Sequence, residues 1–298
     1  MSAIQIDEVA MTKAIQNIQW QLLMRYRMIE IIAFWEGRLT TNHLIDAFGI
    51  GRQQASKDIA VYKHEIAPDN LHYDSVVKGY VPTHQFKAVL TNGLVDEYIK
   101  MLQMFSSKEN DVQYVGKALQ NAEVVQVALR NIDATIFRSL VRAIKEKSRI
   151  DVDYVSVSSP DREGRIIAPH TIVNTGQRWH VRAWCEKNQD FRDFVLSRFR
   201  GEPQFMGESE KRRHHDVNWN TMIDLHIIPD QRLSALQQSV IAHDYGMTNG
   251  RLVLSIRASL VHYLLQQLNI DPHVIHAKPE AQQIVIANLE ELKPFLFS

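Results

Sequence analysis

Cysteine is nearly absent from this chain, whose 298 residues include only Cys185. A single thiol excludes an internal disulfide and any zinc site built from several cysteines. This scarcity is typical of a reducing compartment, so we expect a cytoplasmic protein. No apolar run approaches the roughly 20 residues of a membrane span. Residues 1–16 also lack the apolar core of a signal peptide. The sequence therefore predicts no membrane contact.

An excess of either charge is absent too, because 34 Lys and Arg balance 34 Asp and Glu. A nucleic-acid-binding protein of this composition has to gather its cations on one module.

The motifs of common enzymes are missing: nucleophile elbow, phosphate-binding glycine loop, dinucleotide fingerprint and paired metal-ligand histidines. We therefore predict no catalytic residue, no metal and no cofactor. The length fits two or three domains.

The first eighty residues have the pattern of three helices and a hairpin. Apolar residues recur every three or four positions over 15–33, and Gly37 ends this predicted helix. A short helix over 40–48 and a glycine turn precede a third helix over 52–66. A hairpin follows over 71–81, in which we expect Gly79 to supply a positive φ. This order is typical of a winged helix-turn-helix.

The outward face of the third helix carries residue types that bind DNA. Arg pairs with guanine and Gln with adenine in the major groove, while Ser and Lys suit phosphate oxygens. A small helical bundle with a solvated polar face is the alternative. Residues 1–80 hold eight Lys and Arg against nine Asp and Glu. Affinity therefore has to come from local placement and from a dimer. The predicted DNA-binding residues are Arg52, Gln53, Gln54, Ser56, Lys57, Lys63 and Lys78.

Residues 86–147 have a helical pattern and no chemistry that we recognise, so we expect a linker or a dimer contact. After Arg149 the pattern changes to alternation of apolar and polar residues, as in half-buried strands. Several short strands separated by turn residues are typical of a small barrel.

The segments of this second region resemble the WYL domain family. The resemblance is carried by Ile150–Ser156, Ile167–His170, Arg178–Cys185, Asp190–Phe194 and Leu196–Arg198. The family is named for a Trp-Tyr-Leu tripeptide, where this sequence has Trp179, His180 and Val181. The resemblance implies an Sm-like β-barrel that binds nucleotide-like anions.

The residues agree with an anion pocket, since 138–200 hold thirteen Lys and Arg against eight Asp and Glu. Arg suits phosphate and an aromatic ring suits a base. We therefore predict a nucleotide or oligonucleotide effector. The alternative is that some arginines form structural ion pairs with Asp153, Asp190 or Asp193. The predicted ligand-binding residues are Tyr154, Ser156, His170, His180, Arg182, Arg192 and Arg198.

The last third begins with a polar segment, 202–220, which contains the basic run Lys211–His215. We interpret this segment as a linker or a nucleic-acid contact. Strands and helices then alternate from Met222 onward, which predicts an α+β unit. The resemblance implies that such an extension forms dimer contacts. Phe295, Leu296 and Phe297 are expected to pack against a partner subunit or the same chain.

The predicted fold class is α+β in four parts. A winged helix-turn-helix (1–85) and a helical linker (86–148) precede the WYL barrel (149–205) and a C-terminal dimerisation extension (206–298). This order resembles the WYL regulators of bacterial phage-defence operons, closest to the BREX-associated (BrxR-like) family, with the CBASS-associated (CapW-like) family next. Tracts 40–48 and 53–58 carry the likeness in the first part.

The resemblance implies a homodimeric repressor that binds an inverted repeat in duplex DNA near its own promoter. A nucleotide or nucleic-acid effector in the WYL domain would release it. Two alternatives stay open: an activator responding to DNA damage, and a protein that binds single-stranded RNA.

Overall fold

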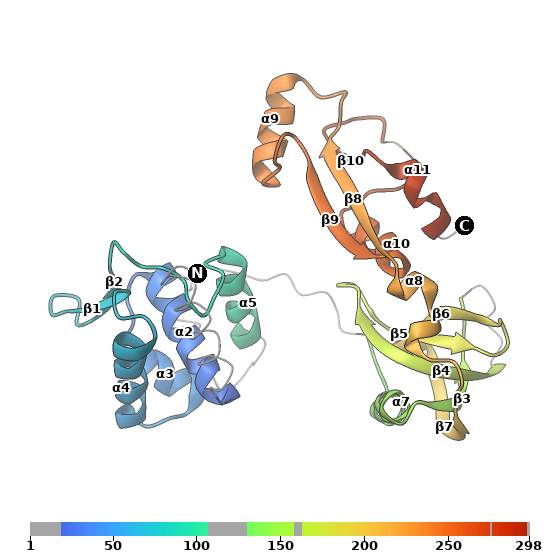
Figure 1. Ribbon diagram of the computed structural model, residues 1–298, viewed down its shortest axis with the longest axis horizontal. Coiled ribbons are helices and arrows are strands. Elements are labelled where there is room, and N and C mark those ends of the chain that lie inside the picture. Colours follow the sequence, from blue (N-terminus) through green and yellow to red (C-terminus); the bar gives the residue numbers. More distant parts are fainter. Residues whose placement is uncertain (1–18, 107–129, 158–162, 275, 297–298) are drawn as a thin grey trace, which may run out of the picture. The chain divides into compact units, whose positions relative to one another are not determined.

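The computed structural model describes residues 19–106, 130–157, 163–274 and 276–296. The chain divides into two compact units, Met1–Gln126 and Val127–Ser298 (Figure 1). None of the described helices is both long and apolar enough to cross a membrane.

The first unit begins with the three expected helices, α2 (Trp20–Glu36), α3 (Thr41–Phe48) and α4 (Arg52–Val61). A glycine with positive φ follows each of the first two helices, a conformation that glycine adopts at little steric cost. The inward side chains of the helices form one core that excludes water. Its fully buried members include Ile29, Ala33, Leu39, Leu44, Ala55, Ile59 and Tyr62.

A hairpin follows the helices, as expected for a wing. α4 continues into one π-helical turn, η1 (Tyr62–Ile66), and the strands β1 (Leu71–Asp74) and β2 (Gly79–Pro82) pair antiparallel. Lys78 has the positive φ of the turn, 50°. Our expectation that Gly79 supplies it was wrong.

Gly79 is required for a different reason, which is close approach. A Cβ added there would lie 2.9 Å from Cγ of Arg38 and 3.0 Å from the carbonyl oxygen of Leu39. The next residue, Tyr80, exchanges two backbone hydrogen bonds with Leu39. The hairpin is thereby attached to the segment between α2 and α3.

The helical pattern expected from residue 86 is interrupted, because 86–94 are irregular and the helix α5 begins at Val95 (Val95–Ser106). Buried Glu30 explains the difference. Its carboxylate accepts hydrogen bonds of 2.9–3.1 Å from three consecutive backbone amides, those of Val89, Leu90 and Thr91. Met101 of α5 belongs to the same core as α2.

The second unit starts with α7 (Ala134–Glu146), which covers an antiparallel sheet of order β6-β5-β4-β3-β7. The described strands leave β6 and β7 as edges, so they do not form the closed barrel that the resemblance implied. β7 includes the first residues of segment 202–220, which we expected to be a linker or a nucleic-acid contact. The strands are β3 (Ser148–Tyr154), β4 (Glu163–Asn174), β5 (Trp179–Cys185), β6 (Asp190–Val195) and β7 (Phe199–Glu208).

The remainder is the predicted α+β extension, a three-stranded antiparallel sheet of order β10-β8-β9 with helices. Leu296 packs against its core, whereas Phe297 lies outside the described residues. The elements are η2 (Leu196–Arg198), η3 (Arg213–His215), α8 (Val217–Asn220), β8 (Met222–Pro229), α9 (Ala235–Asp244), β9 (Leu252–Arg257), η4 (Ala258–Leu260), α10 (Val261–Gln267), β10 (Ile284–Ile286), α11 (Leu289–Leu292) and η5 (Lys293–Phe295).

Candidate nucleic-acid interface and effector cavity

α4 presents a polar face to solvent because its apolar face is fixed in the core. Ala55 and Ile59 are fully buried. Positions one turn apart share a face of a helix. The structure therefore exposes five residues of the predicted DNA-binding set on α4: Arg52, Gln53, Gln54, Ser56 and Lys57.

Two predicted DNA contacts on this segment have different surroundings. Nε2 of Gln54 donates to Oδ1 of Asp58 (2.7 Å), whose other oxygen accepts a bond from Nε of Arg25 (2.6 Å). Asp58 is buried, so this bond ties Gln54 to the contact between α2 and α4. Lys63 is half-buried in the π-helical turn.

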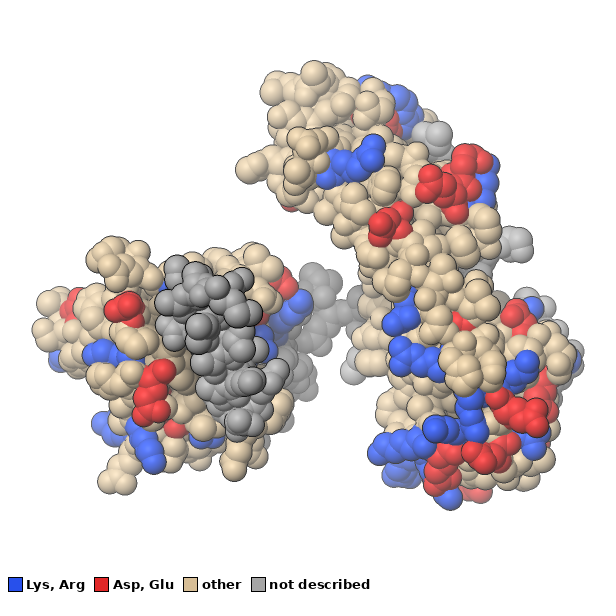
Figure 2. Space-filling model, in the orientation of Figure 1, with Lys and Arg blue, Asp and Glu red and all other residues tan. Residues whose placement is uncertain are grey.

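The wing carries its predicted cation, Lys78, exposed in the hairpin turn. Arg38, which the sequence did not single out, fixes this turn: its Nε donates to the carbonyl of Val77 (2.7 Å) and its Nη2 to that of Lys78 (3.4 Å). Some forty positions separate Arg38 from the turn, so no local pattern relates them. Charges of both signs are scattered over the first unit in Figure 2, which agrees with its lack of a basic excess.

In the second unit, a cavity of about 570 Å³ lies between β5, β6 and α10. We call it the effector cavity, after the effector site that the sequence predicts in this domain. Its wall contains five of the seven predicted ligand residues, namely Tyr154, His180, Arg182, Arg192 and Arg198. The sequence missed Arg178 and the side chains that α10 and its surroundings contribute. The side chains from α10 and its surroundings lie far downstream in the sequence, so only the fold brings them to the cavity. They include Ser259, His262, Tyr263 and Phe295.

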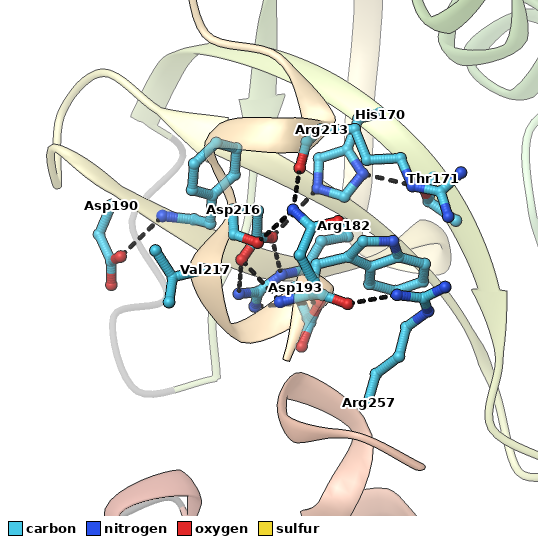
Figure 3. A network of polar contacts seen from close by, with 12 residues as sticks. His170, Thr171, Arg182, Asp190, Asp193, Arg213, Asp216, Val217 and Arg257 are labelled. Atoms are coloured by element: carbon cyan, nitrogen blue, oxygen red, sulfur yellow. Dashed lines mark hydrogen bonds and ion pairs between the residues drawn. The ribbon is translucent and has the colours of Figure 1, made fainter. Parts of the chain in front are cut away.

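Arg182 is held by carboxylates within the protein. Its Nε and Nη2 donate to the two oxygens of Asp216 at 2.7 and 3.1 Å, and its Nη1 lies 3.5 Å from Asp193 (Figure 3). The hydroxyl of Tyr263 donates to the other oxygen of Asp193 at 3.1 Å. Arg182 therefore forms the ion pair with Asp193 that we weighed as the alternative, and a closer one with Asp216 that the sequence did not indicate.

Asp216 accepts bonds from two of the predicted ligand residues at once. Nε2 of His170 lies 3.1 Å from the same oxygen that Arg182 contacts. Burial alone would raise the pKa of Asp216, but the hydrogen bonds from His170 and Arg182 hold that pKa well below its usual value. His170 and Ser156 do not line the effector cavity.

His180 is the buried side chain best placed to meet a ligand. It is 3% exposed, lines the effector cavity, and its Nδ1 has no hydrogen-bond partner. Burial, followed by the charges of Arg178 and Arg198, lowers the pKa of His180 to about 4. The neutral ring can accept or donate one hydrogen bond. Oγ of Ser259 is a second buried group in this wall without a partner.

Four arginines outnumber the two aspartates of the cavity wall, Asp190 and Asp193, which leaves the wall with a small cationic surplus. Among the ion pairs of the described residues, none involves Arg178, Arg192 or Arg198. Tyr154, our expected stacking ring, is buried instead: its hydroxyl accepts the backbone N–H of Val195, and its ring packs edge-on against two phenylalanines. The cavity thus favours an anion that accepts several hydrogen bonds from guanidinium groups.

Comparison with known proteins gives three family matches along the chain. Residues 21–104 match the BrxR transcriptional regulator winged helix-turn-helix domain, 135–201 the WYL domain, and 222–292 the BrxR transcriptional regulator C-terminal dimerization domain. The chain is also similar to the DNA-binding transcriptional repressor CapW of Escherichia coli (strain KTE188), with 35% identity over 97% of both chains. The CapW proteins of Pseudomonas aeruginosa (97% of both chains) and Stenotrophomonas maltophilia (94%) are 33% and 30% identical.

Proposed function

Because the chain belongs to the family of WYL-domain transcriptional repressors that includes CapW, we propose that it represses transcription by binding duplex DNA as a homodimer. The observation that carries this proposal is the exposed polar face of α4, fixed on a closed core next to a wing. Arg52 and Gln53 read base edges, while Ser56, Lys57 and Lys78 contact phosphates. A two-fold symmetric dimer binds an inverted repeat.

The test compares duplex from upstream of the protein's own gene with a scrambled duplex, by fluorescence anisotropy at physiological salt. Arg52→Ala/Gln53→Ala lowers the preference for the operator by roughly tenfold or more. Lys57→Ala lowers the affinity for both duplexes by the same factor. Lys100→Ala, an exposed lysine of α5, is the control and leaves both affinities unchanged. Equal binding of the unmodified protein to both duplexes would contradict the proposal.

We further propose that the operator controls the protein's own phage-defence operon, as the family resemblance implies, and that the protein acts in the cytoplasm. The position of the protein's footprint on the DNA tests whether the protein represses or activates transcription. Overlap with the promoter is the outcome expected of a repressor, whereas a site upstream of the promoter means activation.

The effector cavity is the proposed site of release. Its cationic surplus and buried neutral His180 suit a nucleotide or short oligonucleotide, whose phosphates meet Arg192 and Arg198. Release requires the effector to bind the DNA-free state more tightly than the operator-bound state. We also propose that the five-stranded sheet is related to the Sm-like fold that the WYL resemblance implies.

A short single-stranded DNA serves as the probe for release. In the unmodified protein it lowers operator affinity, and in Arg192→Ala/Arg198→Ala it does not, while operator binding without the probe is unchanged. Lys278→Ala, an exposed lysine away from the cavity lining, responds as the unmodified protein does. If the double variant still releases the operator, the cavity is not the effector site.

A further inference from the structure

The basic run Lys211–His215 is joined by hydrogen bonds to its neighbours. The backbone N–H of Ser209 donates to the carbonyl of Lys147 at 3.0 Å, and Nη1 of Arg212 donates to the same carbonyl at 2.6 Å. Oγ of Ser209 accepts the N–H of Lys211 at 3.0 Å. These hydrogen bonds attach the run to the end of α7.

A cavity of about 350 Å³ lies beside this run, and none of its lining residues is acidic. Basic groups enter it from the end of α7 and from the run: Lys147, Lys211, Arg212, Arg213 and His214. Arg212 is compensated by Glu208, 2.7 Å from its Nη2. The ion pairs of the described residues include none of Lys147, Lys211 and Arg213.

Two of these three cations are placed by aromatic rings rather than by carboxylates. Nζ of Lys211 lies 4.5 Å from the centre of the Trp184 ring, and Cζ of Arg213 lies 5.5 Å from that of Trp219. An aromatic face fixes a cation while leaving its charge uncompensated for a further partner. The wall also contains the hydroxyl-bearing residues Ser148 and Ser209.

We propose that this cavity is a second anion site, which binds phosphate groups of a DNA strand. Uncompensated lysine and arginine in a concave, acid-free wall is the chemistry that phosphates select. It is separate from the effector cavity, since the two share no lining residue. It extends the protein's contact with DNA beyond the winged helix and the effector cavity.

The test uses the full chain and the variant Lys211→Ala/Arg213→Ala. Binding of a labelled single-stranded DNA and of the operator duplex is measured by anisotropy over a range of salt. We expect roughly a tenfold loss of affinity for the form of DNA that occupies the site, and a salt slope smaller by about 1.5. A loss confined to single-stranded DNA identifies an effector strand, and one confined to the duplex identifies the operator flank.

Two further variants make the outcome specific. Lys278→Ala/Lys293→Ala removes the same charge from exposed positions of the C-terminal part and should bind both forms normally. Lys211→Arg/Arg213→Lys keeps the charge and should retain affinity, which separates charge from any effect on folding. If Lys211→Ala/Arg213→Ala binds both forms of DNA as the control does, the proposal is wrong.

Discussion

Arg182 and Arg192 lie in the same cavity wall but differ in their burial and in their ion pairing. Arg182 is 5% exposed and bonded to Asp216, whereas Arg192 is exposed and outside the described ion pairs. A buried ion pair that loses one partner leaves an uncompensated charge in a medium of low dielectric constant. These two residues should therefore respond very differently to the same substitution.

Arg182→Ala is expected to lower the free energy of unfolding by about 3 kcal/mol or more, because Asp216 and Asp193 lose their cation. Arg192→Ala is expected to change it by less than about 0.5 kcal/mol. Urea denaturation followed by circular dichroism measures both. Equal stability of the two variants would mean that the network contributes little to the fold.

His180 makes the stability of the protein depend on pH. Its pKa is about 4 when folded and 6.5 in the unfolded reference, so the unfolded chain binds the proton more readily between these values. Stability from this group is present above pH 6.5 and is lost as the pH falls toward 4, by up to roughly 3 kcal/mol. His180→Gln should lose less stability than the unmodified protein over this window in urea titrations. Parallel pH profiles would show that the ring is not buried in its neutral form.

At the scale of elements, the wing depends on the absence of a side chain at Gly79. Gly79→Ala places a methyl group against Arg38 and the backbone of Leu39, and should cost about 1–3 kcal/mol of unfolding free energy. Gly51→Ala is the control in the same unit, because an added Cβ there meets nothing within 4 Å. A Gly79→Ala protein as stable as the control would show that the wing shifts freely.

The helix α9 has an apolar face without a partner in its own domain. Leu236 and Val240, one turn apart, are 77% and 52% exposed. Since this region matches a dimerization domain, we expect a second copy of the chain to cover this face. Leu236→Glu/Val240→Glu should shift the protein from dimer to monomer in sedimentation equilibrium. Val274→Glu, at an equally exposed apolar position, should leave the dimer intact.

The elements also show which parts of the fold a sequence predicts. The helices α2, α3 and α4 were predicted because one face of each is buried in the same core, which spaces their apolar residues three or four positions apart. β7 was missed because it is exposed along most of its length, with only Phe199 fully buried, so no alternation marks it. Residues 86–94 have a helical pattern in the sequence, yet they are irregular in the structure because the buried carboxylate of Glu30 accepts hydrogen bonds from three of their amides. Glu30 lies about sixty positions away, so no local pattern indicates this interaction.

At the scale of the whole molecule, the same distinction applies to the effector cavity. Arg192, His180 and Arg198 were predicted because they belong to one basic segment of the sequence, in which His180 lies on β5, Arg192 on β6 and Arg198 in η2. Ser259 and Tyr263 come from a helical segment far downstream, and only tertiary packing brings them to the cavity. The role of Asp216 was likewise invisible, since a carboxylate beside two histidines gives no sign of the arginine that it binds.

A ligand that fills the effector cavity contacts both the WYL sheet and the C-terminal part. Differential scanning calorimetry with a saturating short single-stranded DNA should therefore show the second unit unfolding at a higher temperature, stabilised by about 2.7 kcal/mol at a hundredfold excess over Kd. Arg192→Ala/Arg198→Ala should show no shift. A shift equal to that of the unmodified protein would place the ligand elsewhere.

The composition of the cavity wall has a consequence for synthesis of the protein. The winged helix consists of early residues, and its core closes within the first unit. The cavity requires Tyr154 to Arg198 as well as Ser259, Tyr263 and Phe295, which are translated much later than the winged helix. During each round of synthesis, the winged helix is therefore complete before the cavity can form. A nonsense mutation shortly before codon 259 would leave the winged helix intact and remove Ser259, Tyr263 and Phe295 from the cavity wall.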